Sequence, residues 1–462
     1  MSSAFDTGNT AWLMVSTAMV LLMTPGLAFF YGGMVKTNHV LVMLKMSFAC
    51  LALVSLLWLA VGYTLAFGPD AGAGLIGNLD HAFLRGVDMT SLHGSIPTTI
   101  FSCFQMSFAI ITVALISGSI AGRATMRGWL VFVVAWTLLV YIPLAHWVFA
   151  PDGWIAGNLG ALDFAGGLPV EINSGAAGLA CAIVLRRRKD FERQAITPHN
   201  LPLVVIGLAL LWFGWFGFNA GSALQDEGGA PMAFLNTQLA ACAAMISWPI
   251  VEKYQHGKVE MLGVASASVA GMVAITPSCG EVSPVGALVI GFVAGLVCAF
   301  AINFKYKIHV DDTLDVVGVH GFGGIVGTLG IGFFATAAMS GKKGLFYGGG
   351  FDQLWRQAVA VVATIAFSFC MTWLIAQLIN RTVGFRTTEE YEAVPGKEEE
   401  VAYDQATIEE IRSRLAPAGA AAGTSGGVSA AGVPAPAGSR AEADAALLGE
   451  VITLLERRER DK

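Results

Sequence analysis

The sequence predicts an all-α membrane protein with eleven transmembrane helices. Hydrophobic residues make up 55% of the 462 residues and charged residues only 13%, whereas a soluble domain carries about 25% charge. Apolar segments recur along the whole chain, each near the roughly 20 residues that a bilayer requires. We expect spans at about residues 10–33, 40–67, 96–121, 128–149, 168–185, 200–220, 231–251, 258–277, 284–304, 313–338 and 354–380. This balance excludes a soluble globular domain.

The basic residues of the loops predict the orientation of the chain. Loops after odd-numbered spans hold twelve Lys and Arg: Lys36, Arg123, Arg127, Arg186, Arg187, Arg188, Lys189, Arg193, Lys253, Lys258, Lys305 and Lys307. Loops after even-numbered spans hold three, Arg85, Lys342 and Lys343. Because cytoplasmic loops are enriched in basic residues, the N-terminus is expected outside and the C-terminus inside. Residues 1–9 lack the basic region and cleavage site of a signal peptide, so we expect a retained first span and a multi-pass protein of the cytoplasmic cell membrane.

Two pairs of segments indicate an internal repeat. Pro25–Gly33 ends the first span and Trp212–Gly221 ends the sixth, and both are rich in glycine and aromatic residues. Asp163 and Glu171 open the fifth span as Asp315 and His320 open the tenth. With five spans in each half, the second copy must be inverted, which is the plan of many transporters. We therefore expect inverted five-helix repeats followed by a final helix.

The last part of the chain differs from the rest in charge. Residues 1–385, the expected transmembrane transport domain, hold as many acidic as basic residues, so residues 386–462 carry the whole net charge of −6. We interpret 386–462 as a cytoplasmic acidic regulatory tail, with an Ala/Gly/Ser/Pro linker at 416–438 and a possible short helix at 440–460. That helix is either marginal and solvated or a docking or self-association element.

A few ionisable residues fall in or beside the apolar spans. Glu171 and His320 lie within the fifth and tenth spans, where desolvation is costly and an ionisable side chain is a functional-site hypothesis. Their matching places in the two halves predict that they are partners, although each alone could be a packing residue. Asp163 precedes the fifth span and either caps its N-terminus or shapes an entrance.

Several other classes of site find no support in the sequence. The seven cysteines show no CxxC spacing, so we expect neither a metal site nor a disulfide framework and interpret them as small core residues. We find no nucleotide motif and no sign of covalent chemistry. The sequence therefore predicts neither an enzyme nor a cofactor, and it indicates no binding of nucleic acid.

Six segments together carry a family resemblance. They are Pro25–Gly33, Tyr141–His146, Asp163–Gly167, Thr197–Pro202, Gly214–Ser222 and Asp311–Gly321. With these motifs in order over about residues 6–395, the chain resembles the ammonium transporter (Amt/Mep/Rh) family, and its bacterial Amt branch rather than its Rh branch.

The resemblance implies a homotrimer whose protomers each have a pore between inverted halves. It implies an outer site that recruits ammonium by cation–π contacts and a hydroxyl, then a gate of two phenylalanines and a narrow pore with paired histidines. Carried onto this chain, the gate is Phe108 with Phe218, and the hydroxyl is Ser222. Asp163 is the entrance aspartate and His320 the second pore histidine.

The chain departs from the family pattern at two positions. The first pore histidine is replaced by Glu171, a variation that resembles one subset of fungal members. The recruiting tryptophan, expected three residues after His146, is replaced by Phe149, unless Trp147 or Trp154 takes over its task. Tryptophan offers the strongest cation–π face, so a weaker outer site is expected.

These observations predict electrogenic ammonium uptake. Ammonium is recruited at Phe108, Phe149, Ser222 and Asp163 and deprotonated, ammonia passes the gate, and Glu171 and His320 relay the proton. The alternatives are an ammonium sensor that signals through its tail and a leaky channel for monovalent cations or neutral gases. Besides membrane lipid, the resemblance implies a trimeric PII-type regulator at the cytoplasmic face, near Lys36, Arg123 and the tail.

Overall fold

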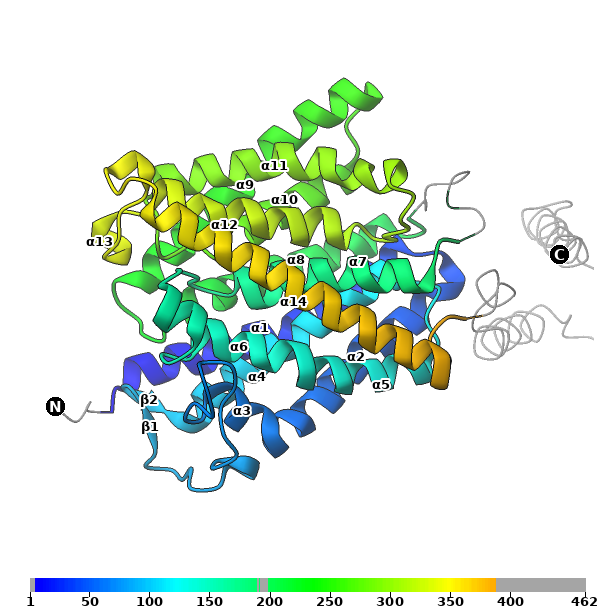
Figure 1. The fold of residues 1–462 in the computed structure, drawn as a ribbon. Helices are drawn as coiled ribbons and strands as arrows, with labels where there is room; N and C mark the ends of the chain where they lie inside the picture. Colours follow the sequence, from blue (N-terminus) through cyan, green and yellow to red (C-terminus); the bar gives the residue numbers. More distant parts are fainter. Residues whose placement is uncertain (1–4, 189–190, 192–197, 388–462) are drawn as a thin grey trace, which may run out of the picture. The chain divides into compact units, whose positions relative to one another are not determined.

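The computed structural model describes residues 5–188, 191 and 198–387, which form a bundle of long helices that run side by side (Figure 1). The α-helices are α1 (Thr7–Met34), α2 (Val40–Leu57), α3 (Tyr63–Phe67), α4 (Thr98–Ile116), α5 (Met126–Trp136), α6 (Ile142–Phe149), α7 (Asn173–Leu185), α8 (Leu201–Gly221), α9 (Gly229–His256), α10 (Met261–Ile275), α11 (Pro284–Lys307), α12 (Phe322–Phe334), α13 (Ala337–Ser340) and α14 (Asp352–Thr382). The predicted linker at 416–438 and short helix at 440–460 lie outside the described residues.

Shorter elements join these helices. The 3-10 turns are η1 (Thr37–His39), η3 (Ala82–Leu84), η4 (Ser117–Ile120) and η9 (Leu345–Tyr347), and the π-helical turns are η2 (Trp58–Gly62), η5 (Thr137–Tyr141), η6 (Trp154–Leu159), η7 (Gly167–Ile172) and η8 (Val317–Gly321). Two strands of two residues each, β1 (Leu92–His93) and β2 (Ile96–Pro97), pair antiparallel, with Leu92 opposite Pro97. This hairpin is a small exception to the predicted all-α fold.

The predicted mostly helical membrane fold is confirmed. Within the described residues, ten helical segments are long and apolar enough to cross a membrane. The eighth predicted span, 258–277, is shorter than expected: α10 has 15 residues and ends at Ile275, where the following Thr276-Pro277 cannot continue a regular helix. The tenth span starts at Val317 rather than at residue 313.

Helices α1 and α8, the first helices of the two expected halves, pack antiparallel along their length. Gly207 lies against Gly26, Gly214 against Met23, and Gly221 against Ser16. A Cβ at any of these α8 glycines would collide with α1. Glycine every seventh residue therefore removes the side chains from one stripe of α8, and close backbone approach of this kind stabilises helix pairs in membranes.

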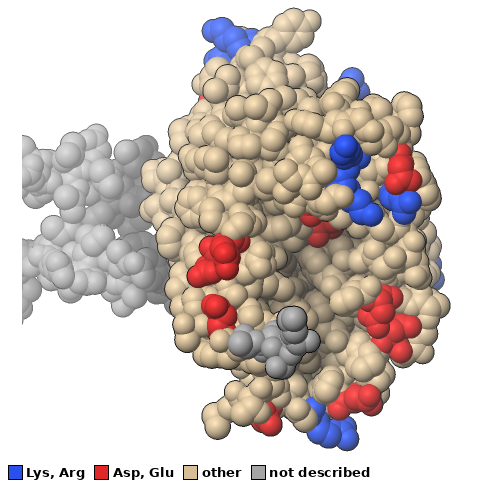
Figure 2. Space-filling model, turned by 90° about the vertical axis from the view of Figure 1, so that its left-hand side faces the viewer, with Lys and Arg blue, Asp and Glu red and all other residues tan. Residues whose placement is uncertain are grey.

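The loops gather at the two ends of the bundle. Figure 2 looks onto the end where α1 begins, and this end is hollowed in its middle, with acidic and basic side chains around the hollow. At the opposite end, the buried guanidinium of Arg123 donates to the backbone carbonyls of Ser119, Arg186 and Asp311. Many of the basic residues that predicted the cytoplasmic face are thus on loops of one end.

A carboxylate organises that opposite end. Arg188 donates to both carboxylate oxygens of Asp311 at 2.8 and 2.9 Å, and Arg123 lies 3.8 Å from one of them. Burial acts to raise the pKa of the Asp311 carboxyl, but Arg123 and Arg188 hold that pKa below its usual value. The backbone N–H of Thr387 donates to the Arg123 carbonyl at 2.8 Å. The segment that leads to the C-terminal tail is therefore attached to this cluster.

Candidate functional site

The fifth and tenth spans cross in the centre of the bundle without side chains between them. A Cβ at Gly175 of α7 would collide with the backbone of Gly321 in η8. One at Gly324 of α12 would touch Glu171 of η7 at 2.9 Å. Gly175 meets Gly321, whereas the earlier residue Glu171 meets the later residue Gly324, so the two spans run antiparallel where they cross. An antiparallel crossing of these two spans is what the predicted inverted halves require.

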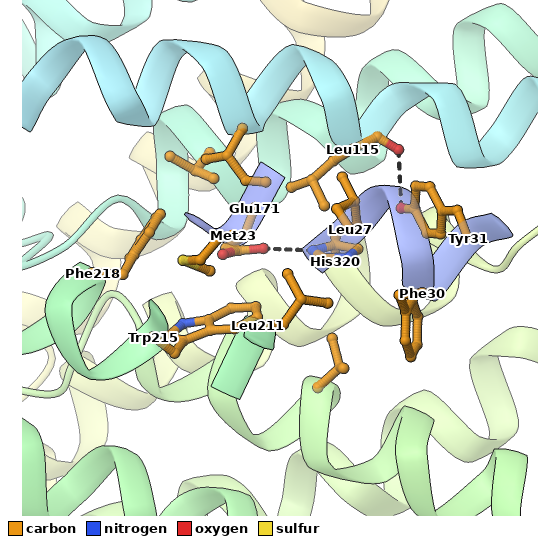
Figure 3. A pocket seen from close by; sticks show the side chains of 13 residues that line it. Met23, Leu27, Phe30, Tyr31, Leu115, Glu171, Leu211, Trp215, Phe218 and His320 are labelled. Atoms are coloured by element: carbon orange, nitrogen blue, oxygen red, sulfur yellow. Dashed lines mark hydrogen bonds and ion pairs between the residues drawn. The ribbon is translucent and has the colours of Figure 1, made fainter. Parts of the chain in front are cut away.

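Glu171 and His320 meet at this crossing (Figure 3). Nδ1 of His320 lies 2.7 Å from Oε2 of Glu171, and the two residues are only 5% and 1% exposed. An ionised Glu171 accepts this hydrogen bond, so Nδ1–H of His320 donates it. Nε2 of a neutral ring is then an acceptor, and among the described residues nothing hydrogen-bonds to it. The pair can therefore offer both a carboxylate and a free imidazole nitrogen.

Two aspartates cap the π-helical turns that carry this pair. The carboxylate of Asp163 accepts from the backbone N–H groups of Gly166 and Gly167 at 2.8 Å and of Leu168 at 2.6 Å. The carboxylate of Asp312 accepts from Val316 at 3.2 Å and from Val317 at 2.8 Å. Each aspartate precedes its pore residue, Glu171 or His320, by eight positions. Asp163 is thus a helix cap.

The repeat therefore aligns differently from the sequence-based expectation. The sequence pattern matches Asp163 with Asp315, but Asp315 forms an ion pair of 2.5 Å with Lys305 and has a backbone φ of 61°. Asp312 occupies the capping position instead. Three carboxylates in five residues made the sequence ambiguous, and only the backbone of η8 distinguishes them.

A narrow cavity surrounds the pair. Its volume is about 20 Å³, room for about one water molecule. The lining is otherwise almost wholly apolar: Met23, Leu27, Phe30, Tyr31, Ile111, Leu115, Val170, Leu211, Trp215, Phe218 and Val269 join Glu171 and His320. Figure 3 shows Phe218 and Trp215 at one end of it and Tyr31 and Phe30 at the other. The Tyr31 hydroxyl donates to the Leu115 carbonyl at 3.1 Å.

Phe218 closes one end of the cavity by stacking on Phe108. The ring centroids are 4.1 Å apart with 24° between the planes, and both residues are 1% exposed. Phe108 also contacts Phe149 edge to face, with ring centroids 6.4 Å apart. The structure thus places Phe149, Phe108, Phe218 and the Glu171–His320 pair in succession.

The other residues expected at the outer site lie as follows. The Ser222 hydroxyl donates to the Phe218 carbonyl at 2.8 Å, so its oxygen lone pairs remain available. Trp147 donates to the Leu75 carbonyl at 2.8 Å and packs on Trp154 and on Phe367. Neither tryptophan has a ring contact with Phe108, so Phe149 is the aromatic residue beside the stacked pair.

Sequence reasoning missed two polar residues near Asp163. Glu281 is buried between α10 and α11 although its loop is not in a span. Gln357 of α14 accepts from the Leu162 N–H at 2.8 Å and donates to the Leu162 carbonyl at 2.7 Å. A lone acidic residue next to an apolar run was the available signal for Glu281, whereas nothing local marks Gln357. The cysteine interpretation was wrong for Cys103 and Cys370, which are exposed on the bundle.

A bundle of long apolar helices with a carboxylate–imidazole pair in an apolar cavity is the architecture of a multi-pass membrane protein. The Ammonium Transporter Family profile matches residues 11–406. The chain is 48% identical to an ammonium transporter of Mycobacterium tuberculosis (84% of this chain and 88% of that protein). It is 47% identical to one of Bacillus subtilis (84% and 95%). The chain belongs to the ammonium transporter family.

Solved structures agree with this assignment. The structure of Saccharomyces cerevisiae Mep2 matches with a TM-score of 0.78 and 33% identity, covering 84% of this chain and 92% of that one. A structure described as a sensor Amt protein matches with a TM-score of 0.78 and 30% identity, covering 85% and 98%. The family consists of transporters and channels rather than enzymes, and the similarity to proteins named ammonium transporters favours transport over sensing.

Proposed function

We propose that this protein takes up ammonium electrogenically, with ammonia and a proton crossing by separate routes. The observation that carries the proposal is the Glu171–His320 pair, which lies in an apolar cavity directly behind the stacked Phe108 and Phe218. Membership of the ammonium transporter family supplies the substrate class.

Recruitment takes place outside the stacked rings. Phe149 and Phe108 present aromatic faces and edges to a cation, and the Ser222 oxygen can accept a hydrogen bond from it. Asp163 acts on this site indirectly, because its carboxylate holds the turn that carries Glu171. Phenylalanine in place of tryptophan makes the cation–π attraction weaker and the affinity lower.

Passage through the cavity favours the neutral molecule. A cavity of about 20 Å³ lined by Leu27, Ile111 and Leu211 cannot replace the hydration shell of an ion. Ammonia loses much less hydration free energy than ammonium does on leaving water, and it can donate a hydrogen bond to Nε2 of His320 as it passes. The ion therefore gives up its proton before the molecule passes Phe218.

The proton follows Glu171 and His320. A carboxylate and an imidazole joined by a 2.7 Å hydrogen bond can exchange a proton with little movement, because accepting it at one end releases it at the other. An ionised Glu171 also stabilises positive charge beside His320 more strongly than a second histidine would. This pore is accordingly better suited to carry a proton than one with two imidazoles.

Family membership supports a proposal for the assembly and location of the protein. The protein forms a homotrimer in the cytoplasmic membrane, with the Arg123–Asp311 end inside and residues 386–462 as its regulatory tail. A PII-type regulator would bind that end. Lys36 is exposed at that end, whereas Arg123 is fully buried, so Arg123 organises this end from inside rather than offering its side chain to a partner.

Currents on a solid-supported membrane test the proposal. Ammonium pulses on proteoliposomes of the wild type should give transient currents between about pH 6 and 8. Glu171→Gln should depress them, while Glu171→His and His320→Glu should change selectivity against potassium. Glu260→Gln, at an exposed surface position, is the control and should behave as the wild type.

The alternatives predict different results. A wild type without current that still binds ammonium would indicate a sensor. Equal currents with potassium and ammonium would indicate a leaky cation channel. Unchanged currents in all three variants of the pair would remove Glu171 and His320 from the proton route. Deleting residues 396–462 should leave transport largely intact if the tail is regulatory.

A further inference from the structure

Glu281 is an acidic residue that the mechanism above does not use. It lies in the bend between α10 and α11, where its N–H donates to the Ser278 carbonyl at 2.9 Å and its carbonyl accepts from Thr336 at 3.3 Å. The next residue, Val282, forms a β-bridge with Ala335. The backbone of Glu281 is thus held from two sides, and the position of its side chain is determined by the fold.

The carboxylate of Glu281 is buried without a cation. Only 8% of the residue is exposed, and Oε2 has no hydrogen-bond partner among the described residues. The neighbouring segment carries two basic residues, Lys342 and Lys343, but both are exposed. The positive charge of Lys342 lowers the pKa of Asp352. A buried carboxylate that lacks a partner must bind a proton, a cation or water.

Asp163 is the charged group beside it. The backbone N–H of Phe164 donates to the Pro277 carbonyl at 2.9 Å, and the Phe164 ring covers Gly280. Burial, and then the negative charge of Asp163, raise the pKa of Glu281 to about 7. The other titratable group in this bend is the Cys279 thiol, whose pKa is raised above its usual value by burial and by both carboxylates.

The carboxylates of Asp163 and Glu281 differ in the hydrogen bonds that their oxygens accept. Burial raises the pKa of Asp163 to about 6, but both of its oxygens accept hydrogen bonds from backbone N–H groups, which favour the ionised form and keep that pKa below that of Glu281. Oε2 of Glu281 accepts none. A proton that arrives at the Asp163 loop is therefore held better by Glu281 than by Asp163.

We propose that Glu281 is the proton acceptor of the outer mouth. Its unpartnered carboxylate oxygen takes the proton that ammonium gives up, so that NH4+ and a carboxylate become NH3 and a carboxylic acid. The proton then passes through water beside Asp163 to Glu171. This inference rests on the proposed function, because an acceptor has a task only if ammonium is deprotonated at the entrance.

The pH dependence of the current tests this role. With the full-length protein in proteoliposomes, the wild-type ammonium current should rise between about pH 6 and 8 as the acceptor ionises. Glu281→Gln should lower the current at pH 7 roughly tenfold or more and remove this rise, because the amide cannot accept the proton. Glu281→Asp should restore part of both. Glu227→Gln, an exposed acidic residue in the loop between α8 and α9, is the matched control.

A spectroscopic measurement keeps the test independent of transport. Infrared titration of the purified protein should show a carboxylic acid signal that disappears near pH 7 in the wild type and in Glu227→Gln. In Glu281→Gln this component should be missing, while the signal of Asp163, whose pKa is raised to about 6 by burial, should remain. A component near pH 7 that persists in a monodisperse Glu281→Gln sample, or a wild-type pH profile of the current in that variant, overturns the proposal. A wild type without any current instead rejects the proposed function itself, before any variant is compared.

Discussion

Nδ1 of His320 lies 2.7 Å from Oε2 of Glu171, although 149 positions separate the two residues in the chain. The contact exists because Gly175 and Gly321 allow two spans to cross with their backbones touching. Neither residue could be buried alone at low cost, since each is an ionisable group in an apolar cavity. Their pairing lets both remain inside the bundle and gives the cavity a site that can hold a proton.

The outer site should bind ammonium more tightly when its aromatic face is improved. Phe149→Trp should lower the half-saturating ammonium concentration roughly two- to fivefold, because tryptophan gains about 0.5–1 kcal/mol in cation–π attraction. The measurement is the current as a function of ammonium concentration. Phe213→Trp, at an exposed position of α8, serves as the control. An unchanged or higher half-saturating concentration in Phe149→Trp would exclude Phe149 from recruitment.

The stacked rings should act as a barrier to ions. Phe218→Ala removes a ring that stacks on Phe108 at 4.1 Å and also forms one end of the cavity. Potassium currents should become detectable in this variant, while Phe218→Leu, which keeps an apolar side chain in place, should stay selective. Core truncations of this kind cost about 3–5 kcal/mol, so thermal stability must be measured alongside. Normal selectivity in a folded Phe218→Ala protein would contradict the gate.

The ion cluster of Arg123, Arg188 and Asp311 should stabilise the fold. Asp311→Asn leaves the buried Arg123 without the carboxylate beside it, and removal of one partner from a buried pair costs about 3–5 kcal/mol. Arg188→Ala should cost less, since the Arg188 side chain is 12% exposed and Arg123 remains as a counter-charge. Thermal unfolding in detergent should therefore rank the wild type above Arg188→Ala and Arg188→Ala above Asp311→Asn. The reverse order would show that the Arg188–Asp311 pair contributes more than the Arg123–Asp311 pair.

Gln357 should position the entrance loop. It hydrogen-bonds both the N–H and the carbonyl of Leu162, next to Asp163, and also the Thr328 carbonyl at 3.2 Å. Gln357→Leu leaves these buried groups unpaired at a cost of about 1–3 kcal/mol and should reduce the ammonium current several-fold. Gln377→Leu, near the other end of α14, is the matched control. Equal currents in the two variants would show that the loop is held by other contacts.

Stability should fall as pH rises through the neutral range. The pKa of Glu281 is raised from 4.5 to about 7, so the folded state binds more protons than the unfolded state between these values. This contribution is fully present below the unfolded pKa and is lost as pH rises through about 7, with a size of about 3 kcal/mol at most. The melting temperature of the wild type should thus decline between about pH 5 and 8. Glu281→Gln should flatten that decline; an identical slope would mean that Glu281 is ionised throughout.

Much of the fold is visible in the sequence because the bilayer imposes strong constraints. Helices must be long and apolar, so the segments around Thr7–Met34 and Pro284–Lys307 can be found from composition alone. Glu171 and His320 stand out for the same reason, since an ionisable residue in such a segment is expensive. The predicted end of the eighth span at residue 277 lies beyond the end of α10 at Ile275, because Pro277 cannot continue the helix.

Composition and spacing are enough to predict the class of protein, the approximate spans and the residues that need polar partners. The identity of those partners depends on the folded chain. Glu171 contacts His320, Asp312 rather than Asp315 caps η8, Arg123 is buried beside Asp311, and Glu281 lies near Asp163 without a cation. Burial of apolar segments is a local property that composition reports, whereas a hydrogen bond or an ion pair depends on which backbones approach closely. In this protein that approach is determined by glycines such as Gly175 and Gly321, whose contact only the folded chain reveals.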